Sequence, residues 1–224
     1  MNSTRQKQEE IYRGLYTEHK GTPMAVSSES LNHKNQRFKL ITNIFKDQTD
    51  VSVHDVGMGL ADLYAFIQTE IKETNVQYSG TDILREFVEE SRLRFPECRF
   101  YHRDIAESAF EDTYDYVLLS GVFHQRRDSS IREWELFWQK MIKNAFLMSR
   151  KGVAFNFVSP FVDFYQTQSY YCNLPKLLNF INDDLSRFFE IKHDYALFEF
   201  TVYVYQESYI KSITPEPEFQ KYFK

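Results

Sequence analysis

The sequence predicts a three-layer α/β/α domain in which a seven-stranded, mostly parallel sheet has a reversed terminal strand. Short apolar runs alternate with segments of helical periodicity over residues 51–158, a pattern typical of parallel sheets with helical crossovers. The last two apolar runs, 189–195 and 198–205, are too close for a crossover, so they must pair antiparallel. A length of 224 residues suits one well-buried domain.

The expected elements follow from the positions at which these periodicities change. Residues 31–45 carry apolar side chains at roughly helical spacing, and Ser28 or Ser30 could cap that helix. Expected strands span residues 51–56, 76–81, 98–102, 114–119 and 153–158, and further helices span residues 63–71, 84–95, 131–149 and 175–187. We therefore expect an N-terminal arm or lid at 1–28, one domain at 29–210 and a tail at 211–224.

The bulk composition limits the possible binding partners and the cellular compartment of the protein. A net charge of -5 and a pI near 5.7 disfavour nucleic acid, whose binding surfaces are usually basic. No apolar run approaches the roughly 20 residues of a membrane-spanning helix, so we expect no membrane association. Cys98 and Cys172 lack a C-x-x-C spacing and the first residues are polar. Both observations favour a cytoplasmic protein.

The stretch Asp55-Val-Gly57-Met-Gly59-Leu-Ala-Asp62 reads as the end of a strand, a tight turn and the start of a helix. Glycines 57 and 59 permit a turn that side chains would obstruct, and they let a ligand approach the backbone. In the dinucleotide-binding pattern a third glycine would fall at position 62, where the pyrophosphate meets the helix. Asp62 would repel a pyrophosphate but would suit a cofactor with a sulfonium and an ammonium group. That cofactor is S-adenosylmethionine.

Acids also stand at the ends of the next two expected strands. Asp82 follows the second strand, where a carboxylate can accept hydrogen bonds from both ribose hydroxyls of an adenosine. Asp104 follows the third strand, and its carboxylate together with the backbone N–H of Ile105 could bind an adenine. Asp55 and the backbone near Ser120 would then surround the methionine portion, whose ammonium needs oxygen acceptors.

In combination, these stretches resemble the class I S-adenosylmethionine-dependent methyltransferases of the bacterial small-molecule type. The matching motifs are residues 55–62, Gly80-Thr-Asp82-Ile83, Arg103-Asp104-Ile105 and residues 114–121, in the order and spacing of that family's first four motifs. Ala61 departs from the pattern, which commonly has a third glycine there. The resemblance implies a Rossmann-like fold, S-adenosylmethionine as methyl donor and S-adenosylhomocysteine as product. The cofactor contacts that we expect come from Arg37, Asp55, Gly57, Gly59, Asp62, Asp82, Ile83, Asp104, Ile105, Ser120 and Gly121.

The implied reaction is an in-line transfer of a methyl group to an oxygen or nitrogen of a small organic acceptor, as in biosynthesis. Such a displacement depends on positioning, and it needs a base only when the nucleophile carries a proton of high pKa. His124 directly follows the fourth strand and is the candidate base; the alternative is a loop histidine that only lines the pocket. A catalytically silent cofactor-binding or partner-binding module with the same fold is the alternative function. The sequence leaves the oligomeric state undetermined.

Aromatic residues after the fifth strand form the expected acceptor side. Most of the 17% aromatic content must be core, because large apolar groups are stabilised by burial. Residues 159–171 nevertheless follow a strand end and should overhang the substrate. Acceptor contacts are expected from Phe123, Phe161, Tyr165 and Tyr170. No further Cys or His stands at ligand spacing from His102 and Asp104, so we expect no metal.

Overall fold

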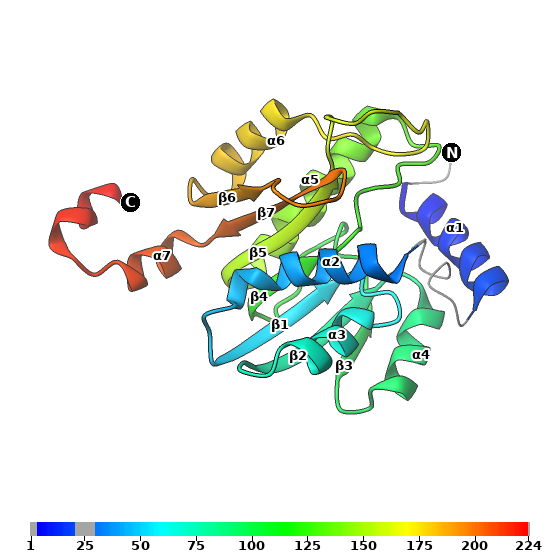
Figure 1. The fold of residues 1–224 in the computed structure, drawn as a ribbon, viewed down its shortest axis with the longest axis horizontal. Coiled ribbons are helices and arrows are strands. Elements are labelled where there is room, and N and C mark those ends of the chain that lie inside the picture. The colour runs from blue at the N-terminus through cyan, green and yellow to red at the C-terminus, as the bar shows by residue number, and fades with distance from the viewer. Residues whose placement is uncertain (1–3, 21–29, 224) are drawn as a thin grey trace.

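The computed structural model describes residues 4–20 and 30–223, and its centre is a seven-stranded sheet (Figure 1). The strand order is β3-β2-β1-β4-β5-β7-β6. The strands are β1 (Asp50–Val56), β2 (Asn75–Asp82), β3 (Arg99–His102), β4 (Tyr114–Leu119), β5 (Ser149–Val158), β6 (Phe189–Lys192) and β7 (Glu199–Tyr205). The first five strands are parallel, and β7 pairs antiparallel with both β5 and β6. The predicted fold class, including the reversed terminal strand, is confirmed.

The helices follow the predicted alternation. They are α1 (Thr4–His19), α2 (Leu31–Thr42), α3 (Asp62–Glu70), α4 (Arg85–Arg94), α5 (Ile131–Leu147), α6 (Leu174–Phe180) and α7 (Glu207–Ile213), with short turns η2 (Asn43–Phe45), η3 (Ile181–Leu185) and η4 (Pro217–Tyr222). Ser30 is the N-cap of α2, and Ser130 with Glu133 forms a capping box at the start of α5. The expected helix over residues 175–187 divides into α6 and η3, and α7 spans the expected start of the tail.

The helices cover the sheet as two layers with separate cores. Successive β4 residues face opposite sides, so Tyr116 and Leu118 pack with the apolar faces of α2 and α3, whereas Val117 and Leu119 pack with α5 and α6. None of the described helices is long and apolar enough to cross a membrane.

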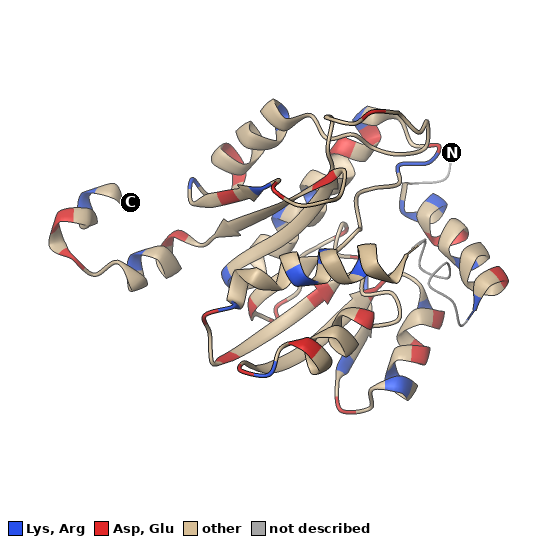
Figure 2. Cartoon of the chain, viewed as in Figure 1, with Lys and Arg blue, Asp and Glu red and all other residues tan. Residues whose placement is uncertain are grey.

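Helix α1 lies over the strand ends beside α4. Both helices carry Lys or Arg interspersed with acids (Figure 2), and Arg13 Nε lies 2.9 Å from Glu86 Oε1 across them. The Tyr16 ring meets the Phe87 ring edge-on at 5.4 Å. The described part of the expected arm is therefore a helix docked on the domain. The alternative cap, Ser28, lies outside the described residues.

Candidate active site

A cavity of about 1310 Å³ lies at the carboxyl ends of the parallel strands, with α1 and the loop after β5 contributing to its walls. Because five parallel strands end at this edge of the sheet, their following loops meet there. The predicted site residues that line the cavity are Arg37, Asp55, Gly57, Gly59, Asp62, Asp82, Ile83, Ile105, Ser120, Gly121, His124 and Tyr165.

The glycine turn after β1 is tied to the end of β2. The N–H groups of Gly57 and Met58 donate to the carbonyl of Thr81 at 2.9 and 3.1 Å. Gly57 has φ 71°, Gly59 has φ 57° and Ala61 has φ 56°, a left-handed region that favours glycine. Ala61 therefore adopts a left-handed backbone that glycine favours, and its methyl group is buried.

Asp82 joins this turn to α4. Its Oδ2 accepts from Gly59 N–H at 3.0 Å and its Oδ1 accepts from Leu84 N–H at 2.9 Å. Burial raises the pKa of the carboxyl to about 6, against the lowering effect of these backbone hydrogen bonds. A carboxylate has about four lone-pair sites, so both oxygens keep capacity for a ligand hydroxyl.

Asp55 holds a buried acceptor atom without a partner. Tyr78 Oη donates to Oδ2 at 2.6 Å, while Oδ1 is buried and has no hydrogen-bond partner among the described residues. Burial raises the pKa of the carboxyl to about 7, although the Tyr78 hydrogen bond lowers it. Buried polar atoms are nearly always paired, so this cavity-lining oxygen indicates that a ligand donor completes the site.

Asp62 is already neutralised by protein cations. Lys34 Nζ on α2 contacts Oδ2, and Arg94 Nη1 on α4 lies 2.5 Å from Oδ1. These two contacts hold the pKa of the carboxyl below its usual value, even though burial raises it. The expectation that Asp62 serves the cofactor's ammonium does not fit this arrangement. Its observed contacts join α2, α3 and α4 around the turn.

Arg37 and Glu199 form a second internal ion pair in the wall. Arg37 Nη2 lies 2.7 Å from Glu199 Oε1, and Nε lies 2.8 and 2.9 Å from the two carboxylate oxygens. Burial raises the pKa of the Glu199 carboxyl, but this effect is outweighed by the charge of a protonated His124, the charge of Arg37 and hydrogen bonds from Arg37 and Asn156. The pKa therefore lies below its usual value. The guanidinium of Arg37, which we expected to contact the cofactor, is thus engaged by Glu199.

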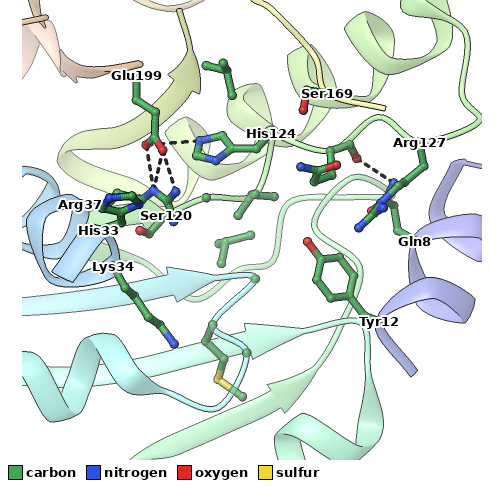
Figure 3. Close-up of a pocket in the computed structure, with 18 of the residues that line it drawn as sticks. Gln8, Tyr12, His33, Lys34, Arg37, Ser120, His124, Arg127, Ser169 and Glu199 are labelled. Carbon is green, nitrogen blue, oxygen red and sulfur yellow. Dashed lines mark hydrogen bonds and ion pairs between the residues drawn. The ribbon is translucent and has the colours of Figure 1, made fainter. Parts of the chain in front are cut away.

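His124 lies beside this pair (Figure 3). Its Nε2 is 3.1 Å from Asn156 Nδ2 and 3.7 Å from Glu199 Oε2. Burial lowers the pKa of His124 to about 4, and Arg37 also lowers it, against the raising effect of Glu199. The imidazole is therefore neutral at physiological pH.

Four predicted contacts lie away from the cavity wall. Asp104 Oδ1 accepts from Ala106 N–H at 2.9 Å, and Oδ2 lies 3.4 Å from Arg5 Nε of α1. Phe123 and Tyr170 are core side chains that pack on Phe157. The expectation that these two rings contact the acceptor does not fit this packing, because burial of large apolar rings in the core removes them from the cavity.

The remaining aromatic, Phe161, is 69% exposed and its ring lies 6.2 Å from that of His193. It projects from the loop after β5 without lining the cavity. Tyr165 does line the cavity, together with Phe164 of the same loop. The loop therefore reaches the site through Tyr165, which was expected, and through Phe164, which was not.

Comparison with known proteins finds one similar sequence and several structures of the same fold. No family model matches the chain. A Mycobacterium tuberculosis protein named "Putative methyltransferase Rv1506c" is 28% identical over 159 residues, which are 70% of this chain and 94% of that protein. The solved structure of magnesium protoporphyrin IX methyltransferase (ChlM) from Synechocystis PCC 6803 with bound S-adenosylmethionine matches with a TM-score of 0.64 at 14% identity, covering 92% of this chain and 98% of that chain. This chain therefore has the fold of S-adenosylmethionine-dependent methyltransferases and is similar in sequence to a protein named as a putative methyltransferase.

A second methyltransferase structure shares the fold. The N-methyltransferase NodS from Bradyrhizobium japonicum WM9, in complex with S-adenosylhomocysteine, has a TM-score of 0.57 at 10% identity, with 91% of this chain and 98% of that chain covered. At these identities the structural matches show the common fold, and the chemistry of the acceptor half has to be derived from this chain's own side chains.

Several residues at this site were not predicted from the sequence. Glu199, the first residue of β7, lines the cavity, and Asn156 of β5 donates a hydrogen bond to it. Both are polar residues among apolar neighbours in the sequence, and that interruption was the available signal. Gln8 and Tyr12 come from α1, which carries no motif, and only the docking of α1 brings them to the cavity.

Proposed function

We propose that this protein transfers a methyl group from S-adenosylmethionine to an oxygen or nitrogen of a small organic acceptor. The observation that carries the proposal is the unpartnered, buried Asp55 Oδ1 in the cavity wall beside the glycine turn. An ammonium group is the donor that such an oxygen would bind most strongly, because charge-assisted hydrogen bonds exceed neutral ones.

The side chains present fit each part of this cofactor. Asp55 would accept from the ammonium, and Asp82 would accept from the ribose hydroxyls through its remaining lone pairs. Ile83 and Ile105 line the same cavity and offer apolar surface to an adenine. Asp104 stands outside this set because its carboxylate is engaged by Ala106 and Arg5.

The cofactor supplies an activated methyl group, and this chain's contribution is positioning. Methyl transfer is an in-line displacement, so alignment of the acceptor atom with the methyl carbon accounts for much of the rate enhancement. Tyr12 and Leu15 of α1 line the cavity, and they would exclude water from the space above the strand ends.

Isothermal titration of the full chain with S-adenosylmethionine and S-adenosylhomocysteine tests the proposal. Binding of both ligands, with a loss of about 10- to 100-fold in Asp55→Asn, is the expected result, since a charge-assisted hydrogen bond contributes roughly 1.5–3 kcal/mol. Glu111→Gln, a charge change outside the cavity wall, is the control. Absence of binding to the parent protein would contradict the proposal. Binding without methyl transfer to any acceptor would support the catalytically silent module instead.

A further inference from the structure

The orientation of the Asn156 side-chain amide is fixed by a backbone group. Gly121 N–H lies 2.7 Å from Asn156 Oδ1, and because a backbone N–H can only donate, the amide oxygen must face it. Asn156 Nδ2 then faces His124 Nε2 at 3.1 Å and Glu199 Oε2 at 2.7 Å. An amide nitrogen only donates, so His124 Nε2 must accept with its lone pair and the neutral ring carries its proton on Nδ1.

This tautomer removes the basic lone pair of His124 from the cavity. Nε2 is occupied by Asn156, and Nδ1–H is a donor with no hydrogen-bond partner among the described residues. Protonation at Nε2 would set two donors against each other at 3.1 Å. The charged groups that face the ring are Glu199 of β7 and Arg37 of α2, and they neutralise one another. His124 is therefore built to donate to an acceptor molecule and not to take its proton.

The carboxylates of the wall are engaged as well. Glu199 accepts from Arg37 and Asn156, and Asp62 contacts Lys34 and Arg94. The two other wall acids stand at the ends of β1 and β2, where the proposed cofactor lies. His124 and these carboxylates are thus not free to remove a proton from a nucleophile, and among the described wall residues the remaining imidazole is that of His33 on α2.

Arg127 provides an uncompensated positive charge in the same cavity. The cavity-lining cations Lys34, Arg37 and Arg103 each pair with a carboxylate, whereas Arg127 forms no ion pair within residues 4–20 and 30–223. Its Nη1 donates to Gln168 Oε1 at 2.6 Å, and its Nε is buried without a partner. Figure 3 shows the side chain on the side of the cavity formed by Gln8 and Tyr12 of α1.

An apolar rim accompanies this charge. The Phe164 and Phe198 rings meet edge-on at 5.9 Å, and Tyr165 packs against Tyr171 at 4.7 Å. Phe164, Tyr165 and Phe198 line the cavity although 58%, 69% and 45% of each is exposed. Exposed rings of this size at a cavity indicate an apolar ligand surface.

We propose that the methyl acceptor is the ionised form of a carboxylic acid with an apolar body. One oxygen of its carboxylate is methylated, and Arg127 attracts and binds its negative charge. The inference rests on the proposed function. His124 Nδ1–H donates to the acceptor, and the rings of the loop after β5 contact its apolar body. A guanidinium suits this role because its planar donors match a carboxylate.

The reaction then balances without a base. A lone pair of the carboxylate oxygen forms the bond to the methyl carbon, while the bond from that carbon to the sulfonium sulfur breaks and its electron pair passes to sulfur. The products are a neutral methyl ester and the thioether of S-adenosylhomocysteine. No proton leaves the acceptor, so the reaction requires none of the imidazoles or carboxylates of the wall as a base.

Binding of a matched pair of probes tests the recognition step. The full chain, saturated with S-adenosylhomocysteine, is titrated with 2-naphthoate and with the neutral 2-naphthamide. We expect the carboxylate to bind at least 10-fold more tightly, Arg127→Gln to abolish this preference, and Arg127→Lys to keep part of it. Arg132→Gln, which removes the same charge from an exposed position of α5, should keep all of it. No carboxylate binding, no preference in the parent, or an unchanged preference in Arg127→Gln would overturn the proposal.

Two further measurements address the reaction and the tautomer. Mass spectrometry of aryl carboxylates, alcohols and amines incubated with methyl-labelled S-adenosylmethionine should find methyl esters, and labelled ethers or amines alone would overturn the proposal. Nitrogen-15 NMR of histidine-labelled protein should assign the Nδ1–H tautomer to His124, and an Nε2–H tautomer would refute the donor role. Each variant is also titrated with S-adenosylhomocysteine. If the protein binds this ligand but gives one of the contrary results above, only the acceptor proposal fails; if the parent does not bind it, the proposed function fails.

Discussion

Arg37 on α2 forms a bidentate ion pair with Glu199, the first residue of β7, across 162 positions of sequence. Because β7 runs antiparallel to β5, its first residue lies at the carboxyl ends of the parallel strands and not at the opposite edge. The pair therefore holds α2 against the cavity wall, and it also supplies Asn156 with an acceptor for Nδ2.

Breaking this pair should cost stability. We expect Glu199→Gln to lower the free energy of unfolding by about 2–4 kcal/mol. This loss is somewhat smaller than the loss expected for a fully buried ion pair, because the Arg37 side chain is partly exposed to water. Urea denaturation measures the change. The double variant Arg37→Met/Glu199→Leu should recover most of the loss, since no uncompensated charge remains. Asp184→Asn, which breaks the exposed pair with Lys143, is the control and should cost less than about 1 kcal/mol. Equal costs would refute the structural role of the pair.

The buried Asp55 carboxyl should make the protein without cofactor less stable as pH rises. Burial favours the neutral form and raises the folded-state pKa to about 7, above the unfolded value of about 3.9. Stability contributed by the neutral acid is thus complete below pH 4 and is lost as pH rises through 7. Asp55→Asn should be more stable than the parent at pH 8, on the order of 1–3 kcal/mol, with a smaller difference at pH 5. Thermal unfolding at both pH values checks this sign.

Cofactor affinity should have the opposite pH dependence. An ammonium binds the ionised form of Asp55, so S-adenosylhomocysteine affinity should fall as pH decreases below about 7, by up to roughly tenfold per pH unit. Titration calorimetry between pH 5.5 and 8.5 measures the profile. In Asp55→Asn the decline should shift toward about pH 6, where Asp82 titrates. A pH-independent affinity in the parent would disprove the ammonium contact.

The glycine turn should distinguish position 57 from position 61. A Cβ at Gly57 would meet Val122 Cγ2 at 2.9 Å, and the residue has φ 71°, so Gly57→Val should reduce cofactor affinity at least 100-fold by displacing the loop. Ala61→Gly should leave affinity within about threefold, because glycine prefers the φ of 56° observed there. Calorimetric titration of both variants, with circular dichroism to verify folding, tests the contrast. Equal affinities would exclude the turn from the cofactor site.

The sequence by itself determined the layered fold and the position of the residues that we propose for the cofactor. Parallel strands and helices have distinct apolar periods, and each strand is followed directly by its own loop, so Asp55, Gly57 and Asp82 could be assigned to one edge of the sheet before any coordinates. These are local relationships, in which a residue's place follows from the element that precedes it. The fold class that they predicted is the one observed.

Only the tertiary structure decided which charges are free for a ligand. Two ion pairs join distant segments of the chain, Lys34 with Asp62 and Arg37 with Glu199. The residues next to them in the sequence do not indicate this pairing. The same holds for the Asn156 amide, whose contact with Gly121 fixes the tautomer of His124. Hydrogen bonds and ion pairs depend on distances of about 3 Å between side chains, and such distances are set by the packing of whole elements, which periodicity in the sequence does not encode.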